Sequence, residues 1–375
     1  MYLMEWLMWL SVVKSDSWLQ EQGEDDSSND LAGKPVEPVE PVYEDLLVAE
    51  YARLRAARFD HAISRSPVYA CNNTILEMRC GGMEDKRGFI TMISALFFLP
   101  LAGAGNTNYI FLTRFGLDSL NWWEICSLIF QLSLGIGVLY AYFKYLFRFT
   151  RLESFTSRHL LIRFNRITRQ VYLHRPPSCG GIAVLPWDDI HHDEVPGVNL
   201  IVGWYTPYSP LPFPNMVFVG KKSVSEAEMK AEWEYIRRYM DEGGLDAVDP
   251  PRISSHLPLP WPAFAAQFEA LGPYLRHSGP ITWFGMLLIS PALVVLGLAH
   301  WASLLLCWRP RWPKIIQEAG LPGKPIPPLT TIDDYPPKVR AALLENVHRW
   351  VVKPGSPPPR PKRFSLKGRW QNRDR

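Results

Sequence analysis

The chain has 375 residues, of which 47% are hydrophobic and 21% are charged, and its 40 basic and 37 acidic side chains leave a net charge of +3. This length is enough for two or three domains with a substantial core, so disorder throughout the chain is excluded. The five cysteines are too few for a small disulfide-stabilised scaffold, and we expect all of them to be free thiols.

The N-terminal part of the chain is acidic. Residues 1–50 carry twelve acidic side chains. Residues 1–13 predict a packed or interfacial amphipathic helix, because no basic residue precedes their apolar part as it would in a signal peptide. Residues 21–44 contain the repeat Pro-Val-Glu-Pro-Val-Glu-Pro, which is typical of an exposed linker. We therefore expect residues 1–50 to be partly disordered, and residues 51–87 to be a cytoplasmic helical segment.

Two uncharged stretches predict a transmembrane helical hairpin over residues 88–147. Residues 88–113 and 125–143 contain no charged side chain, and each stretch is long enough to cross roughly 30 Å of hydrocarbon at about 1.5 Å per residue. A pair of buried core helices is the alternative. Basic residues flank both outer ends, whereas Arg114 is the only basic residue between the two stretches. The positive-inside bias therefore places both flanks in the cytoplasm.

A third hydrophobic segment, residues 278–308, is either a further span or a re-entrant hairpin. It is uncharged and contains Pro291 and His300. A single span would put the basic region after it outside, against the charge bias. A re-entrant or interfacial hairpin broken near Pro291 would return that region to the cytoplasm, and this interpretation is slightly favoured. His300 is either a functional intramembrane group or, more often in such a position, an interfacial one.

Residues 151–250 predict a soluble α+β domain. Short β-prone runs occur at residues 159–165, 170–174, 182–187, 198–205 and 216–220, separated by turns. A helix should follow, because Ser223 or Ser225 can form a capping box and Gly243-Gly244 can end the helix. Met229, Trp233, Ile236 and Met240 share one face of that helix, and its other face is charged.

The fold class expected from these elements is an α+β membrane protein. It would combine the transmembrane helical hairpin, a small pleckstrin-homology-like β-sandwich with a capping helix, and the further hydrophobic helical segment. The β-sandwich is a likeness of fold alone and carries no ligand with it.

Motifs for catalysis are largely missing from the sequence. It contains no glycine-rich phosphate loop, His-Glu-x-x-His, Gly-x-Ser-x-Gly or Cys-x-x-Cys, so we expect a non-enzymatic protein without a cofactor. The weak candidates for a metal or acid/base site are His191, His192, Asp193 and Glu194. Adjacent residues rarely converge on one ion, and the Pro-Gly that follows favours an exposed polar loop instead.

Residues 309–375 form a basic region with fifteen Lys or Arg and five acidic side chains. An amphipathic helix should start at Pro336-Pro337, with Val339 and Leu343 on its apolar face. The Pro/Arg-rich tail that follows supplies candidates for binding lipid or a protein partner: Arg360, Lys362, Arg363, Lys367 and Arg369. Nucleic acid is not expected as a partner, because the tail lacks a folded recognition module.

Several motifs together resemble a family of uncharacterised bacterial inner-membrane proteins often found near type VI secretion effector genes. These motifs are Arg163-Phe-Asn-Arg166, Leu185-Pro-Trp187 and Trp233-x-Tyr-Ile-Arg-Arg-Tyr-Met240, which follow the hairpin in this order. The resemblance spans roughly residues 85–320. It implies a multi-pass inner-membrane protein with a cytoplasmic 151–250 domain that binds a secreted effector as an accessory or immunity factor. A membrane-bound enzyme and a lipid-binding scaffold are the alternatives.

Overall fold

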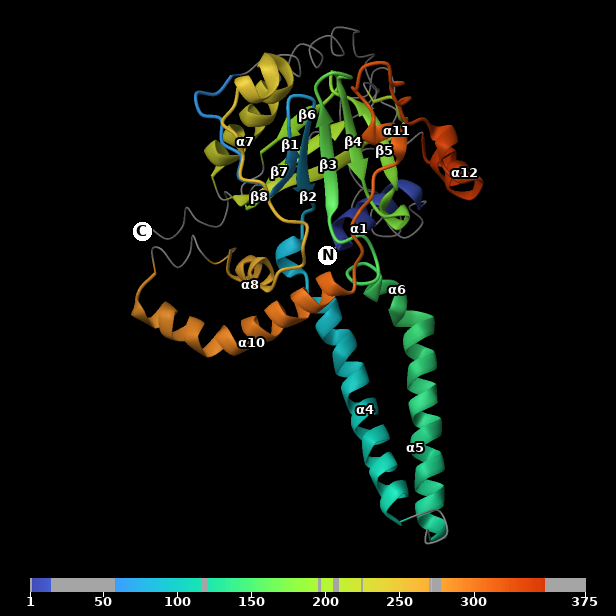
Figure 1. Cartoon of the computed structure of the whole chain (residues 1–375). Helices are drawn as coiled ribbons and strands as arrows, with labels where there is room; N and C mark the ends of the chain where they lie inside the picture. Colours follow the sequence, from blue (N-terminus) through green and yellow to red (C-terminus); the bar gives the residue numbers. More distant parts are fainter. Residues whose placement is uncertain are drawn as a thin grey trace, which may run out of the picture.

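The computed structural model describes residues 2–14, 58–115, 121–194, 197–204, 209–223, 225–269, 271 and 278–347. These residues form a β-domain, a long helical hairpin that projects from it, and an apolar helix that runs crosswise where the two meet (Figure 1). The chain is therefore a mixed α and β protein, with three helices that are long and apolar enough to cross a membrane.

Eight strands of the described chain form one antiparallel, half-barrel sheet. They are β1 (Val68–Cys71), β2 (Ile75–Cys80), β3 (Leu160–Asn165), β4 (Gln170–His174), β5 (Ile182–Pro186), β6 (His191–Asp193), β7 (Val198–Trp204) and β8 (Asn215–Ser223). The strand order is β5-β4-β3-β2-β8-β7-β6, and β1 also pairs with β2. The five strands predicted within residues 151–250 are confirmed.

The helical hairpin is inserted between two neighbouring strands of this sheet. Strands β2 and β3 are paired along their whole length, from Ile75 opposite Asn165 to Cys80 opposite Leu160. The chain between Cys80 and Leu160 leaves the sheet, forms the hairpin and returns to the same edge of the domain (Figure 1). The helical hairpin therefore takes the place of a turn between two hydrogen-bonded strands.

The segment 51–87, expected to be helical, is corrected in its described part. Strands β1 and β2 lie within it, and β2 is central because it pairs with β3 and with β8. The β-domain thus begins well before residue 151. Residues 15–57, which include the acidic linker and the start of this segment, lie outside the described residues.

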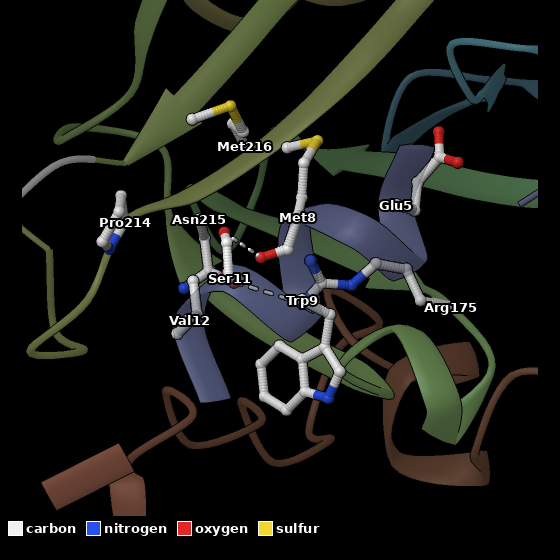
Figure 2. Close-up of a pocket in the computed structure, with 9 residues that line it drawn as sticks. All are labelled: Glu5, Met8, Trp9, Ser11, Val12, Arg175, Pro214, Asn215 and Met216. Carbon is white, nitrogen blue, oxygen red and sulfur yellow. Dashed lines mark hydrogen bonds between the residues drawn. The ribbon is translucent and has the colours of Figure 1, made fainter. Parts of the chain in front are cut away.

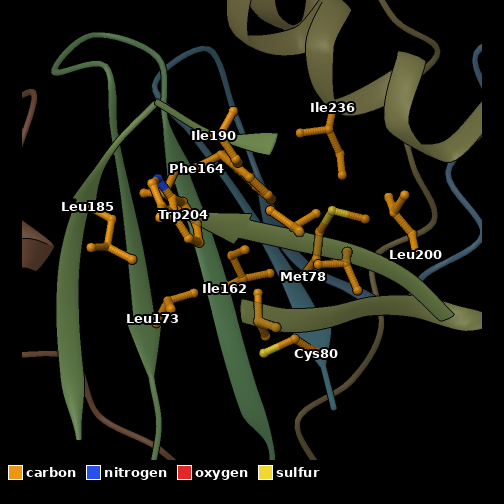
Figure 3. Close-up of a cluster of buried hydrophobic side chains, with 14 of the residues drawn as sticks. Met78, Cys80, Ile162, Phe164, Leu173, Leu185, Ile190, Leu200, Trp204 and Ile236 are labelled. Carbon is orange, nitrogen blue, oxygen red and sulfur yellow. The ribbon is translucent and has the colours of Figure 1, made fainter. Parts of the chain in front are cut away.

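The core of the β-domain fills the concave side of the sheet. Figure 3 shows side chains from β2, β3, β4, β5 and β7 converging there with Ile236 of a helix. Phe164, Trp187 and Trp233 are fully buried, and the two indole rings stack with their centroids 5.7 Å apart. Burial of large apolar side chains of this kind is the main stabilising contribution to such a domain.

The predicted amphipathic helix is confirmed as α7 (Glu226–Arg238), which continues in a π-helical turn, η4 (Tyr239–Gly243). Its four predicted apolar residues are all buried. The predicted capping box is wrong, because Ser225 makes no side-chain cap and the Ser223 hydroxyl donates to Glu228 instead. The charged face also differs from expectation, since the Glu234 carboxylate is buried and accepts hydrogen bonds from Arg237 and Arg238.

Both ends of the described chain pack on the β-domain. Helix α1 (Leu3–Val13) is packed, and α12 (Pro337–Glu345) lies beside it, with the Asn346 amide donating to the Val13 carbonyl over 2.9 Å. The predicted start at Pro337 and burial of Leu343 are confirmed. Ile316 of α11 (Lys314–Gln317), together with Trp312 and Ala319, covers the outer face of the sheet. Ile332 of η6 (Ile332–Asp334) packs against the core cluster instead.

The outer face of the sheet holds a buried ion pair. Glu77 of β2 lies opposite Arg163 of β3, and the guanidinium Nη2 is 2.6 Å from Glu77 Oε2. Trp312 covers the pair, because its indole N–H donates to the same carboxylate oxygen and its ring lies 4.8 Å from the guanidinium carbon. The first part of the basic region is thus docked on the sheet.

The three long apolar helices are α4 (Phe89–Phe115), α5 (Trp122–Ala141) and α10 (Pro280–Leu305). Helix α5 passes through a π-helical turn, η2 (Tyr142–Leu146), into α6 (Phe147–Thr150). Helix α10 runs without interruption through Pro291, so the predicted break at this residue is wrong. The short helix α8 (Pro260–Glu269) packs beside it (Figure 1).

Candidate functional site

The predicted cluster at residues 191–194 is not an exposed loop. His191–Asp193 form β6, paired with β7, and the His192 side chain is only 5% exposed because its ring stacks on Trp233 at 4.3 Å. His192 Nε2 lies 3.2 Å from Glu194 Oε1. Within the described part of the chain, no group of three or more His, Cys, Asp or Glu is placed to hold a metal ion. The cluster therefore contributes an imidazole–carboxylate pair and a packing contact.

The predicted lipid- or partner-binding residues of the tail, Arg360, Lys362, Arg363, Lys367 and Arg369, lie outside the described residues, which end at residue 347. All five cysteines are free, as expected.

A group of buried and nearly buried polar side chains lies where the helical hairpin and α10 meet the β-domain. We call this group the joint and define it as Glu84, Arg87, Glu153, His159, Gln267, His300 and Ser303. These residues come from η1 (Glu84–Lys86), α8, α10 and the segments that flank α4 and β3. The joint therefore connects four parts of the chain that are far apart in sequence.

Arg87 is the centre of the joint and has no solvent exposure. Its Nε donates to Ser303 Oγ over 2.9 Å, and its Nη2 donates to the Glu153 carbonyl over 3.0 Å and to Cys307 Sγ over 3.1 Å. Its Nη1 donates to the Arg158 carbonyl and to Glu84 Oε1. A buried guanidinium is tolerated only when its donors are satisfied and a carboxylate is near, and both conditions hold here.

Glu153 caps the start of α4 from the other end of the hairpin. Its Oε1 accepts hydrogen bonds from the Gly88 amide at 2.8 Å and the Thr91 amide at 3.1 Å, and its Oε2 accepts from the Ile90 amide at 3.2 Å. The first amides of a helix have no partner within the helix, and a carboxylate there is favoured by the helix dipole. Glu153, which follows α5 and α6 in the chain, thus holds the first turn of α4 in place.

Two histidines contact the remaining acid of the joint. His159 Nδ1 and His300 Nε2 each lie 3.8 Å from Glu84 Oε1. Burial lowers the pKa of His159 from 6.5 to about 4, although Glu84 opposes this shift. His300 is buried and its Nδ1 is 3.0 Å from Gln267 Nε2, so it is an internal partner of α8.

Two glycines allow the helices to approach closely at the joint. A side chain on Gly88 would place a Cβ 2.6 Å from the Leu296 carbonyl oxygen and the His300 amide, and its φ of +103° itself favours glycine. A Cβ on Gly297 would lie 2.4 Å from Phe264 of α8. The start of α4 therefore rests directly on the backbone of α10, as small residues permit in tightly packed helices.

A second group of buried polar atoms lines a pocket between α1 and the sheet (Figure 2). Arg175 Nη2 donates to Asn215 Oδ1 over 3.2 Å, and Met8, Trp9 and Met216 form apolar walls. The cavity volume is about 90 Å³, well below the roughly 300 Å³ at which pockets for drug-sized ligands begin. Burial raises the pKa of Glu5, whose Oε1 accepts from the Gly82 amide at 2.8 Å.

The arrangement of the joint suits a mechanical role. Its polar groups are directed at each other and at backbone atoms, and the described pocket lies elsewhere, between α1 and the sheet. In the sequence, Arg87 is one of the basic residues that flank the hairpin, and Glu153 belongs to no motif. The available signal was their position, since Arg87 directly precedes the first uncharged stretch and Glu153 is the first acidic residue after the second one, where a buried ion needs a partner.

No family model, curated protein or solved structure matches the chain.

Proposed function

We propose that this protein is a multi-pass inner-membrane protein in which helices α4 and α5 cross the bilayer and hold a pleckstrin-homology-like β-domain at the cytoplasmic face. The observation that carries this proposal is the exposure of the hairpin: Leu96, Ile129 and Ile136 are 58%, 59% and 68% exposed although they are large and apolar. Helices that expose such side chains along their length need lipid or protein around them.

The polar boundaries of the hairpin support the same placement. At the sheet end, Arg87 and Glu153 are satisfied inside the joint. At the far end, Asn121 and Glu124 form a reciprocal capping box, and Trp122 and Trp123 are 72% and 81% exposed, as suits side chains at a membrane interface. Glu124 therefore has a local capping role.

For the activity of the protein, we propose binding of another protein, as an accessory or immunity factor of a secreted effector. The family resemblance supports this assignment, and so does the joint, which ties the β-domain to the proposed spans through buried hydrogen bonds. A domain that is already ordered and oriented loses little conformational entropy when a partner binds to its surface. The basic tail, residues 354–375, is the segment proposed to contact an acidic partner or anionic lipid.

Co-expression tests this proposal. Full-length tagged protein is purified in detergent from cells that also produce the product of the neighbouring gene as the candidate effector, and survival of those cells is scored. A complex together with protection supports effector binding, whereas neither a complex nor protection contradicts it. A chain truncated after residue 353 should lose the complex if the tail binds the partner. His192→Ala removes a ring packed on Trp233 and its contact with Glu194 but leaves the tail intact, so this control variant should retain the complex.

The same truncation distinguishes the two alternatives. Flotation with anionic vesicles that depends on residues 354–375, with no effector bound, would favour a lipid-binding scaffold. Stoichiometric metal in the purified parent protein that is lost in His192→Ala would favour an enzyme.

A further inference from the structure

Helix α10 has 26 residues and would rise about 39 Å, which is enough to cross a membrane. We propose that it does not cross but lies in the plane of the leaflet nearest the β-domain, with its apolar surface among the acyl chains and both of its ends on the β-domain side. This inference rests on the proposed function, because it takes α4 and α5 as the spans that define the membrane.

The C-terminal end of α10 is fixed to the β-domain. Arg158, two residues before β3, donates to the Leu304 carbonyl over 3.1 Å and to the Cys307 carbonyl over 3.0 Å. The backbone continues this contact, since the Arg158 amide donates to the Trp308 carbonyl over 2.8 Å. A basic side chain on the last carbonyls of a helix is a favourable cap. The chain therefore leaves α10 at the sheet end of the hairpin.

The N-terminal end of α10 has no route to the opposite side of the membrane. Helix α8, which precedes it, is held in the joint because Gln267 Nε2 donates to the Arg87 carbonyl over 3.1 Å. Residues 270–279 connect α8 to α10, and as a helix they would rise only about 15 Å, compared with roughly 30 Å of hydrocarbon. An extended crossing would leave backbone groups unpaired in lipid, and Arg276 lies within this segment.

The packing of α10 agrees with a crosswise position. Its buried residues are Gly297, His300, Ser303 and Leu304, all in its last third, and none of residues 280–296 is buried. A third span beside α4 would instead bury a stripe of side chains along its length. Figure 1 shows α10 leaving the joint at a steep angle to α4 and α5.

The membrane leaflet is the partner that this surface fits. Ile281, Leu287 and Leu288 are 88%, 67% and 67% exposed, and apolar side chains surround the helix on all sides. The contact with Gly88 places α10 at the level where α4 starts, which is the level of the membrane surface in the proposed arrangement. Trp261 beside it is 80% exposed, as suits an interface. Arg276 and Arg309 flank both ends, where anionic headgroups would lie.

Variants of the full-length protein that each carry one added cysteine, in sealed, uniformly oriented vesicles, test this inference. An impermeant maleimide is applied before and after permeabilisation, and the parent protein with its five cysteines gives the background. Gly279→Cys reports the start of α10, where a Cβ meets no atom within 4 Å. Lys314→Cys reports the β-domain side, because the Lys314 side chain is 87% exposed. Trp123→Cys reports the far end of the hairpin.

We expect Gly279→Cys to react from the same side as Lys314→Cys and from the opposite side to Trp123→Cys. Reaction of Gly279→Cys from the Trp123→Cys side would show that α10 crosses, and would overturn the inference alone. Reaction of Lys314→Cys and Trp123→Cys from the same side would show that the hairpin does not cross, and would overturn the proposed function itself.

A fourth variant, Leu288→Cys, identifies what covers the middle of α10. It should resist the impermeant reagent from both sides and become reactive only in detergent. Ready reaction before detergent would place the helix in water. Quantitative oxidation to a disulfide-linked dimer in the vesicles would place a second copy on this surface. Either result contradicts burial among acyl chains.

Discussion

Replacing Arg87 by methionine should destabilise the protein by about 3–5 kcal/mol, the cost typical of removing one partner from a buried ion pair. The variant loses donors to Ser303, Cys307 and the Glu153 carbonyl, and it leaves the Glu84 carboxylate buried without its cation. Methionine preserves most of the unbranched side chain, so the loss of packing is small. Urea denaturation in detergent micelles, followed by tryptophan fluorescence, measures the free energy of unfolding.

Arg169→Met is the matched control for this prediction. Arg169 also bridges two acids, with Nη2 2.6 Å from Asp188 and Nη1 3.3 Å from Asp241, but its side chain is 43% exposed. Exposed pairs contribute about 0–1 kcal/mol, so this variant should unfold close to the parent. Arg87→Lys should be intermediate, since it keeps the charge but loses the planar fork of donors. Equal stability of Arg87→Met and Arg169→Met would refute the role given to the joint.

The remaining predictions concern single buried groups. The pKa of His159 falls from 6.5 to about 4 on folding, so the stability linked to its neutral form is complete above pH 6.5 and is lost as the pH falls toward 4. This linked stability is about 3 kcal/mol. His159→Gln should therefore make the free energy of unfolding depend less on pH over this range. Burial raises the pKa of Glu232 above its ordinary value of 4.5, so Glu232→Gln should gain stability relative to the parent as the pH rises above 4.5. A difference in the free energy of unfolding that does not change with pH would contradict this. Gly220→Ala should cost more than about 1 kcal/mol in urea denaturation, because φ is +84° and a Cβ would lie 2.2 Å from Glu232. Gly297→Ala should speed amide exchange in α8, and Phe264→Ala in the same chain should restore it.

The strands of the later part of the β-domain were predictable because each is a short β-prone run between turns. Strands β1 and β2 carry the same signal, with Asn72-Asn73 between two apolar runs, which is typical of a β-hairpin. They were missed because the uncharged stretch after them suggests a domain boundary. That inference fails when a helical hairpin is inserted between paired strands, since the sheet then continues on both sides of it.

The joint was not predictable from the sequence, for a physical reason. Its residues come from segments up to about two hundred residues apart, and the bond from Arg87 to Ser303 is an example. Local patterns report periodicity and caps within one element, whereas a buried ion depends on partners that only the tertiary fold supplies. The crosswise direction of α10 was also not predictable, because the sequence gives only the length of this helix and its apolar character.

The position of the hairpin within the sheet has a consequence for how the two parts move. The ends of the hairpin join β2 and β3 where Cys80 pairs with Leu160, and Glu153 closes the first turn of α4 from the returning chain. A sliding of α4 relative to α5 must therefore break either the amide bonds of Glu153 or the pairing of β2 with β3. Buried polar networks tend to have discrete arrangements. A partner bound to the β-domain would thus be sensed by the hairpin only if its binding disrupts the joint, and amide exchange at Gly88 and Thr91 is the measurement that reports this.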